Sequence, residues 1–354
     1  MAKTKRVAQT RVDEQPATKG SLNRPRKTVG EPKIDSDNVG GDGQAPNVGD
    51  GSANESTLGS MKVQPRPGKK RQKSKDENTR PTKTPRDGTR KSSRDGGKAQ
   101  PTQLQLLNYL ISKEAEELCR PDDEKEYLKD HGKATTYGSM DLNPHEELMS
   151  AVILSRRLNH RLGLRSIRTL LNSPYDFSSA KKTQAAGPEK QHQAFRDAKT
   201  RYTEKTAYEV GEIANVVLEK YSDEGDEDGM ELSRLLKQSN NIDELLNTLK
   251  TDIKGFGNTT RDIFHRRIQR LWDDAYPYID KKAGEGLKAL GLPDHAGELE
   301  EAINSNWKHL ESKTLFGNDG PAKKRTAFAT ILERAIDAGL EGKTSEVIRT
   351  AASA

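Results

Sequence analysis

Cysteine is almost absent from this chain of 354 residues, in which Cys119 is the single example. One thiol forms no disulfide within the chain and no cysteine-rich metal site, so the sequence favours a reducing compartment. Long apolar runs are absent too. No stretch of about 18 apolar residues occurs, so no membrane-spanning helix is expected. The first 15 residues lack the apolar centre of a secretory signal, so secretion is not expected either.

Aromatic residues are scarce and unevenly placed. Residues 1–100 contain no Phe, Trp or Tyr, so all 17 aromatic residues follow Gln100. A segment without aromatics and with few branched aliphatics buries too little apolar surface to offset the entropy that is lost on ordering. We therefore predict a disordered basic tail over residues 1–100 and a folded domain over residues 101–354.

Positive charge is concentrated in the same tail. Residues 1–100 hold 23 Lys and Arg against 12 Asp and Glu, whereas the remainder holds 37 against 42, so the body is mildly acidic. A cationic tail suits a polyanion because each neutralised phosphate releases counterions, although such a tail also serves simply as a solubilising segment. The basic clusters at 24–27 and 68–75 are typical of nuclear import signals or nucleic-acid arms, and we expect a nuclear location.

The body shows helical spacing throughout. Apolar residues recur three and four positions apart in segments such as "LQLLNYLI", and no stretch alternates with the period of two that marks a strand. Asn143 and Pro144 form a start signal for a helix whose centre, "LMSAVIL", is strongly apolar. The pair Gly187 and Pro188 breaks another helical stretch. We therefore predict an all-α domain of roughly ten helices.

One junction between two predicted helices combines glycine, an aromatic residue and a helix start. The segment "IKGFGNTTR" places Gly255 and Gly257 on either side of Phe256, which is expected to point into the core. The glycines permit positive φ and leave no Cβ in front of the next helix. Asn258 or Thr259 is expected to cap that helix. Free N–H groups at a helix N-terminus suit a phosphate, but the same residues also form an ordinary turn with a glycine C-cap.

This junction resembles the helix-hairpin-helix motif, whose hairpin reads apolar–Pro–Gly–apolar–Gly, with Lys254 in place of the proline. Upstream, "PHEELMSAVILSRRLN" is similar to the early core helix of the endonuclease III-like DNA glycosylases. Downstream, "WDDAYPYIDKKAGEGLKALGLP" occupies the place where that superfamily carries an aspartate and then a helix ending in an "LGL" turn. Order and spacing agree over residues 140–295. The resemblance implies a helix-hairpin-helix DNA-glycosylase-like helical domain.

The resemblance also implies the chemistry. In this superfamily one aspartate stabilises the oxocarbenium-like transition state that forms as the bond between base and sugar breaks. The matching residue is Asp280, for which a helix N-cap is the structural alternative. Relatives that nick the DNA backbone carry a lysine at the position of Thr259, where it forms a Schiff base. The chain therefore looks like a monofunctional N-glycosylase. No cofactor is expected, because the iron–sulfur cluster of many relatives needs four cysteines.

The resemblance further implies that the hairpin, the start of its second helix and the residues after the aspartate contact double-stranded DNA. These residues are Lys254, Gly255, Phe256, Gly257, Asn258, Thr259, Thr260, Arg261, Lys281 and Lys282. The last two stand where the family usually has a small hydroxyl residue followed by His or Asn, so the surroundings of Asp280 differ from the family pattern.

Two further groups of side chains allow two interpretations each. Tyr137, Tyr276 and Tyr278 have rings that suit stacking on a flipped base, although core packing is favoured for the last two. Arg266 and Arg270 share one helix face, which suits either phosphate contacts or a solvated face that pairs with nearby aspartates.

The sequence thus favours a monomeric DNA-binding protein of base excision repair that releases a base from DNA. Two alternatives remain open. One is a non-catalytic DNA-binding protein with the same helix-hairpin-helix fold. The other is an all-α protein-interaction domain in which the hairpin is only a turn, an interpretation that the acidic body favours.

Overall fold

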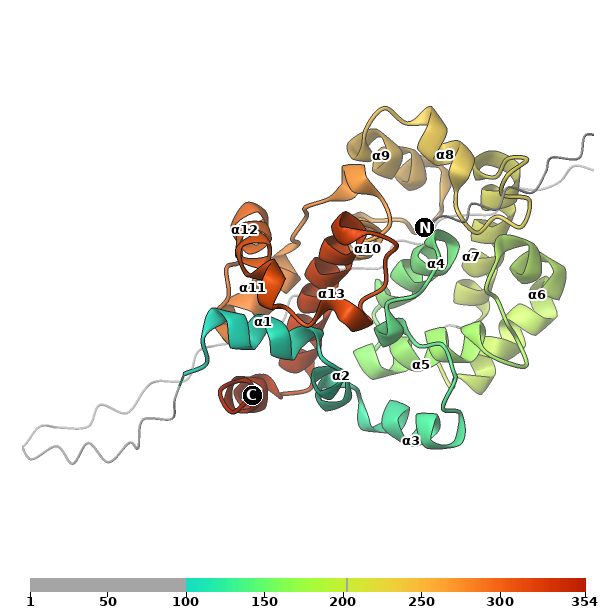
Figure 1. Ribbon diagram of the computed structural model, residues 1–354. Coiled ribbons are helices and arrows are strands. Elements are labelled where there is room, and N and C mark those ends of the chain that lie inside the picture. The colour runs from blue at the N-terminus through green and yellow to red at the C-terminus, as the bar shows by residue number, and fades with distance from the viewer. Residues whose placement is uncertain (1–99, 202) are drawn as a thin grey trace, which may run out of the picture. The chain divides into compact units, whose positions relative to one another are not determined.

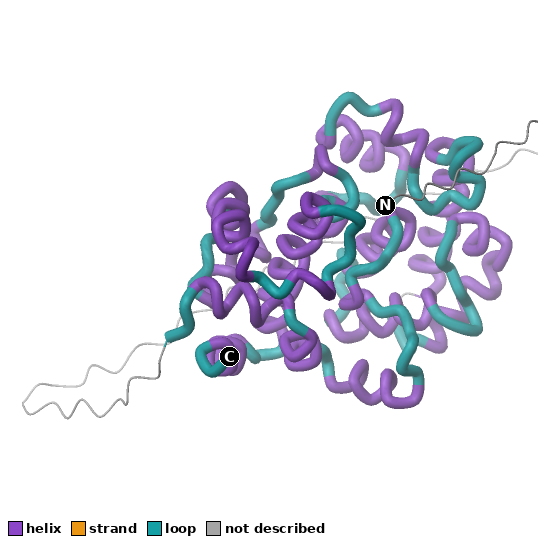
Figure 2. Tube along the Cα trace, in the orientation of Figure 1, coloured by secondary structure: helices purple, strands orange, loops and turns teal. Residues whose placement is uncertain are grey.

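The computed structural model describes residues 100–201 and 203–354, so the predicted tail over residues 1–100 lies, except for Gln100, outside the described residues. The described residues belong to one compact unit. They contain fourteen α-helices and several single turns of 3-10 or π helix, with no strand among them (Figures 1 and 2). The prediction of an all-α domain is confirmed, with more helices than the roughly ten that periodicity indicated.

The helices follow one another with short connections. The first seven are α1 (Gln103–Ile111), α2 (Lys113–Cys119), α3 (Asp122–Asp130), α4 (Pro144–Leu154), α5 (His160–Leu171), α6 (Ala180–Asp197) and α7 (Thr203–Val216). The other seven are α8 (Ser233–Gln238), α9 (Ile242–Asp252), α10 (Asn258–Ile268), α11 (Lys281–Leu290), α12 (Ala296–Asn306), α13 (Gly320–Leu340) and α14 (Thr344–Ala351). The single turns are η1 (Tyr137–Ser139), η2 (Val217–Tyr221), η3 (Asp273–Ala275), η4 (Trp307–His309) and η5 (Ser312–Thr314).

Several local signals act as the sequence predicts. The Asn143 side chain caps α4 by accepting the backbone N–H of Glu146 at 3.0 Å, and Pro144 occupies the first helical position. Gly187 has φ 71° and interrupts α6 immediately before Pro188, so this helix is two helical segments joined at a kink. Both features follow from backbone chemistry alone, which explains why they are readable without tertiary contacts.

Two groups of helices build the interior. Near the chain ends, α1 and α2 pack with α11, α12, α13 and α14 around one apolar core. In the middle of the chain, α4 packs against α5, α7 and α10, and α6 packs against α7. Figure 1 shows α1, α12 and α13 close together and apart from α6–α9. Helix α10 belongs to the middle group and also contacts α13, so it joins the two groups.

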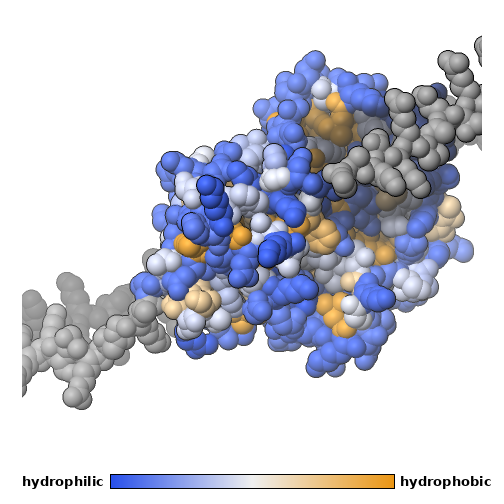
Figure 3. Space-filling model, viewed as in Figure 1, coloured by the Kyte–Doolittle hydropathy of each residue, from blue (hydrophilic) through white to orange (hydrophobic). Residues whose placement is uncertain are grey.

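The surface of the described unit is largely polar. Hydrophilic side chains dominate the face seen in Figure 3, where apolar side chains form separate patches. Among the described residues, no helix has both the length and the apolar character needed to cross a membrane. Most large apolar side chains of the described residues are buried in the cores of the two helix groups.

Candidate functional site

The hairpin between α9 and α10 has the predicted form. Gly255 has φ 94°, a conformation that L side chains rarely adopt, whereas Gly257 has φ −88°. The Phe256 side chain is only 3% exposed and meets Phe264 edge to face, with ring centroids 6.1 Å apart. The prediction that this aromatic residue points into the core is confirmed. The two glycines are not equivalent, because only the first requires a left-handed backbone.

The start of α10 differs from the prediction. Gly257 is the N-cap, and no side chain makes a capping hydrogen bond there, so the expected cap by Asn258 or Thr259 is wrong. Asn258 instead is the first helical residue, because the backbone of Gly257 already accepts the N–H of Arg261 at 2.9 Å. The first backbone N–H groups of α10 therefore face outward past a residue without a side chain, which is the arrangement that suits an anion.

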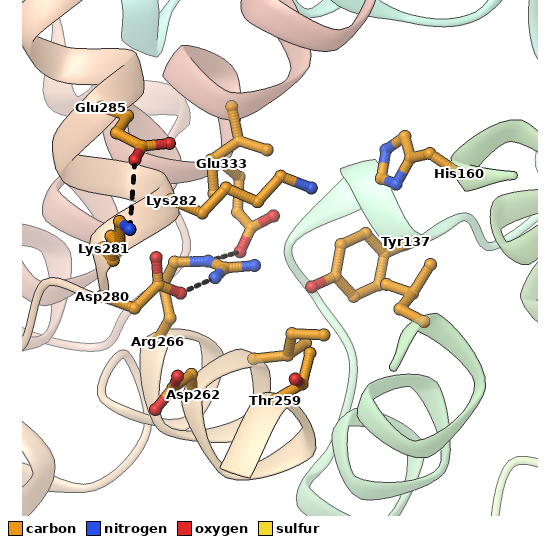
Figure 4. Close-up of a pocket in the computed structure, with 13 residues that line it drawn as sticks. Tyr137, His160, Thr259, Asp262, Arg266, Asp280, Lys281, Lys282, Glu285 and Glu333 are labelled. Carbon is orange, nitrogen blue, oxygen red and sulfur yellow. Dashed lines mark hydrogen bonds and ion pairs between the residues drawn. The ribbon is translucent and has the colours of Figure 1, made fainter. Parts of the chain in front are cut away.

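A cavity of about 330 Å³ opens beside this helix start. Its walls come from five elements, namely η1, α5, α10, α11 and α13, together with the end of α4 (Figure 4). The lining residues are Tyr137, Leu154, His160, Thr259, Asp262, Ile263, Arg266, Asp280, Lys281, Lys282, Glu285, Glu333 and Ile336. Most of them carry a charge or a polar group, but the surface that they expose to the cavity is mainly apolar, so the cavity suits a ligand with both apolar and polar parts.

Asp280 is the helix N-cap that the sequence offered as the alternative to a catalytic role, and it also lines the cavity. Its Oδ1 accepts the backbone N–H of Ala283 at 2.7 Å, so the carboxylate is the N-cap of α11. The same side chain lines the cavity and is 6% exposed. Its Oδ2 accepts a hydrogen bond from Arg266, whose Nε donates to Glu333 at 2.7 Å. Figure 4 shows this guanidinium between the two carboxylates. The carboxylate that caps α11 is therefore also part of the cavity wall, and hydrogen bonds from Ala283 and Arg266 fix its position.

Three arginines of α10 and its C-terminal end are buried rather than solvated. The predicted exposed face of Arg266 and Arg270 is therefore wrong, both as a phosphate-contacting surface and as a solvated one. The carboxylate of Glu147 in α4 accepts hydrogen bonds from Arg267 Nε at 2.9 Å and from Arg270 Nη2 at 2.8 Å. Burial opposes the charge of Arg266, but the carboxylates of Glu333 and Asp280 outweigh burial and raise the pKa of this guanidinium above its ordinary value. These ion pairs hold the helices around the cavity.

The cavity gathers only part of the predicted DNA contacts. Thr259, Lys281 and Lys282 line it together with Asp280. Thr260, in contrast, is buried, and its Oγ1 lies 2.9 Å from Ser155 Oγ. The threonine thus ties α10 to α4 behind the hairpin.

The other predicted DNA contacts lie on the outer side of the hairpin. Lys254 is exposed, with its amine 5.8 Å from the centre of the Tyr208 ring. Arg261 forms an ion pair with Asp243 at 2.6 Å. Asn258 is exposed as well, and its Oδ1 accepts a hydrogen bond from Lys250. These side chains border the helix start but do not reach the cavity.

Tyrosines divide between the core and the cavity. Tyr276 packs edge to face on Phe328, and Tyr278 stacks on His265 with ring centroids 3.8 Å apart. Both are half-buried and lie outside the cavity walls. Tyr276 packs against the core around α13, as the favoured interpretation predicts, whereas Tyr278 belongs to none of the apolar cores of the described residues. Tyr137 lines the cavity and is 3% exposed, with a hydroxyl group that has no hydrogen-bond partner in the described part of the chain. Burial raises the pKa of Tyr137 well above its ordinary value, so this hydroxyl is a neutral donor.

Sequence reasoning missed Glu333 and His160. Glu333 lies within the apolar stretch "AFATILERAI" of α13, and a carboxylate inside such a run is the one signal that pointed to a buried ionic partner. His160, at the start of α5, has its Nε2 3.3 Å from Asp337 Oδ1, and nothing in the sequence connects these positions. Within residues 100–201 and 203–354, no group of three or more His, Cys, Asp or Glu is placed to hold a metal ion.

The fold and the site together define an all-α protein with a helix-hairpin-helix and a carboxylate-bearing cavity beside the hairpin. No protein-family model matches the chain, and no curated protein matches it. Among solved structures the chain is similar to the 3-methyladenine DNA glycosylase MagIII of H. pylori, bound to 1,N6-ethenoadenine. The two sequences are 15% identical, the similarity covers 68% of this chain and 98% of that protein, and the TM-score is 0.38.

Proposed function

We propose that the chain binds duplex DNA through the hairpin and breaks an N-glycosidic bond, releasing a base and leaving an abasic site. One observation carries the proposal: Thr259, from the uncapped start of α10, and Asp280 line the same cavity. A phosphate at the helix start would bring a neighbouring nucleotide within reach of the carboxylate. A base reaches such a cavity only after it leaves the helical stack, and about 330 Å³ lies within the usual range for ligand pockets.

Charge in the cavity supports the proposed chemistry. Breaking the base–sugar bond leaves positive charge on the sugar in the transition state, and a fixed carboxylate nearby stabilises it. Arg266 is one positive charge against the two carboxylates of Asp280 and Glu333, so this trio carries a surplus of negative charge. Hydrogen bonds from Ala283 and Arg266 fix the orientation of Asp280, which lowers the cost of organising the site during the reaction.

The decisive variant is Asp280→Asn. An asparagine oxygen still accepts the N–H of Ala283 and still caps α11, but the negative charge is gone. Base release from duplexes carrying a broad panel of damaged or mismatched bases is expected to fall by about a hundredfold or more. Asp274→Asn, which removes an exposed aspartate outside the cavity, is the matched control and is expected to retain release. Thermal melts of both variants separate lost chemistry from lost folding.

A second candidate function has its own supporting observation. Both oxygens of Asp280 are engaged, one by Ala283 and one by Arg266, and the residue is nearly buried. That arrangement equally suits a non-catalytic DNA-binding protein in which the carboxylate is structural. Binding to duplex DNA that weakens steeply with salt, without base release and without change in Asp280→Asn, would favour this second function. Absence of DNA affinity even at low salt would contradict both functions and favour a protein-interaction domain.

Base excision repair and a nuclear location belong to the same proposal. The basic clusters at 24–27 and 68–75 support nuclear import, although they lie outside the described residues. Fluorescent fusions of the full chain, with and without these clusters, test this part separately from the chemistry. Uniform distribution of the intact fusion between nucleus and cytoplasm would contradict it.

A further inference from the structure

A second cavity, of about 430 Å³, lies between α6 and α7, which are side by side in Figure 1. Its α7 wall is one face of that helix, made of Glu204, Ala207, Tyr208, Gly211, Glu212 and Asn215. The small residues Ala207 and Gly211 leave the hollow, and the kink of α6 at Gly187 and Pro188 lines the other side. This α6–α7 pocket shares no lining residue with the cavity beside Asp280, so it is a separate site.

An exposed aromatic ring borders the α6–α7 pocket. Tyr208 is 56% exposed, the largest fraction among the large apolar side chains of residues 100–201 and 203–354. The amine of Lys254, in the hairpin, is 5.8 Å from the centre of this ring. The pocket therefore lies next to the hairpin. Exposed aromatic rings are surfaces on which unpaired bases stack, because every base has a π face.

Glu212 supplies a carboxylate that neighbouring groups hold in place. Its Oε1 accepts a hydrogen bond from Asn215 Nδ2 at 3.2 Å, and Asn215 Oδ1 accepts one from Gln184 Nε2 of α6 at 2.9 Å. The negative charge of Glu212 and its hydrogen bond with Tyr208 raise the pKa of the Tyr208 hydroxyl. A carboxylate only accepts hydrogen bonds and has room for several donors. The pocket thus suits a planar ligand whose edge carries N–H groups.

The charges around the pocket distinguish between classes of ligand. The carboxylates of Glu204 and Glu212 repel a phosphate from the interior, whereas Lys254 beside Tyr208 attracts one. A basic peptide fits less well, because Lys254 repels a second cation. A nucleotide matches both signs, with its phosphate outside and its base inside. Among the bases of DNA, guanine has two N–H donors side by side on one edge, N1–H and N2–H, and a carboxylate accepts such a pair.

We propose that the α6–α7 pocket binds an unpaired guanine of the DNA held at the hairpin. The ring stacks on Tyr208, and N1–H and N2–H donate to the carboxylate of Glu212. The inference rests on the proposed function, because the DNA must be held at the hairpin, but it does not depend on the breaking of a glycosidic bond. The pocket would make the chain prefer DNA sites with an unpaired guanine near the bound phosphate.

The test measures the affinity of the full chain, at one fixed salt concentration, for duplexes with a short thymidine overhang. One position of the overhang carries guanine, adenine or the baseless analogue tetrahydrofuran, and 3′ and 5′ overhangs are both used. Adenine matches guanine in ring size but lacks the pair of donors. In one of the two polarities, we expect guanine to bind about tenfold more tightly than adenine, and adenine about tenfold more tightly than tetrahydrofuran.

Variants assign these preferences to the pocket. Tyr208→Ala is expected to remove the preference for adenine over tetrahydrofuran, whereas Tyr208→Phe keeps the ring and should retain it. Glu212→Gln should reduce the preference for guanine over adenine to less than about twofold, because the amide replaces one acceptor oxygen by a donor. Glu219→Gln, at an exposed position of η2 outside the pocket, is the matched control and should keep both preferences.

The outcomes separate this inference from the proposed function. Equal affinity of the parent for all three overhangs overturns the inference and leaves the proposed function intact, because the duplex is still bound. A preference for guanine that persists in Glu212→Gln, or a preference for adenine over tetrahydrofuran that persists in Tyr208→Ala, overturns it by assigning the base to another site. Failure to bind any of these duplexes overturns both.

Discussion

Replacing Gly255 with alanine is expected to destabilise the folded chain by about 2–5 kcal/mol, from two sources. The backbone φ of 94° lies in the left-handed region, where an L side chain costs about 1–2 kcal/mol. The added Cβ would also lie 2.4 Å from Arg156 Nη2. Arg156 would have to move away from Glu209, its ion-pair partner at 2.5 Å, and an unpaired buried carboxylate adds about 1–3 kcal/mol.

Gly257 provides the matched comparison within the same hairpin. Its φ of −88° suits any residue, and an added Cβ would meet nothing within 4 Å. Gly257→Ala is therefore expected to cost no more than about 1 kcal/mol, the difference between glycine and alanine at an N-cap. Urea unfolding followed by circular dichroism measures both variants. For a loss of several kcal/mol, thermal melts should show Tm lowered on the order of 5–15 °C for Gly255→Ala.

The same two positions separate stability from DNA binding. A larger side chain at Gly257 fills the open space in front of the α10 N-terminus, so Gly257→Val is expected to weaken duplex binding about tenfold while the fold is kept. Equal destabilisation by the two alanine variants, or a Gly255→Ala protein as stable as the parent, would refute the reasoning from φ and the Arg156 contact. Unchanged DNA affinity in Gly257→Val would argue against a phosphate at the helix start.

Two further predictions concern the buried charges and the buried imidazole. Glu147→Gln leaves Arg267 and Arg270 without their shared carboxylate and is expected to cost about 3–5 kcal/mol in urea unfolding, whereas Glu298→Gln at an exposed site should change stability by less than about 0.5 kcal/mol. Burial lowers the pKa of His265 to about 4 in the folded protein. The stability that the neutral imidazole contributes is therefore complete above the pKa of histidine in the unfolded chain, and it is lost as pH falls toward 4. Relative to His265→Gln, the parent should lose about 1.4 kcal/mol per pH unit between pH 6.5 and 4, and a constant difference across that window would contradict the prediction.

Much of the fold was predictable because its signals are local. The capping of α4 by Asn143, the break at Gly187 and the inward position of Phe256 each depend on residues within a few positions in the sequence. The all-α class follows from periodicity in the same way. The start of α10 is an exception among local features. Gly257 is the N-cap although N-cap propensity ranks asparagine above glycine, so the hairpin geometry overrides the local preference for Asn258.

The site was predictable only in part, because its geometry depends on distant segments. Arg266 and Arg270 were expected at the surface because charged residues are rarely buried without a partner. Their partners are Glu333 and Glu147, which lie 67 and 123 positions away in the sequence. No local pattern reveals such pairs. Asp280 was ambiguous for a related reason, since a helix N-cap and a cavity wall require the same residue type and differ only in what faces them.

Helix α10 fixes the distance between the hairpin and the carboxylate of Asp280. It begins at the uncapped N-terminus beside Thr259, and seven residues later it presents the guanidinium of Arg266, which holds Asp280 of α11 and Glu333 of α13. Seven residues of α-helix span about 10 Å. The position of the Asp280 carboxylate relative to a ligand at the helix start is thus set by a rigid helix rather than by a loop. If a bound ligand tilted α10, the N-terminus of the helix and Arg266 would move together. The position of Asp280 would therefore change with the position of the ligand at the helix start.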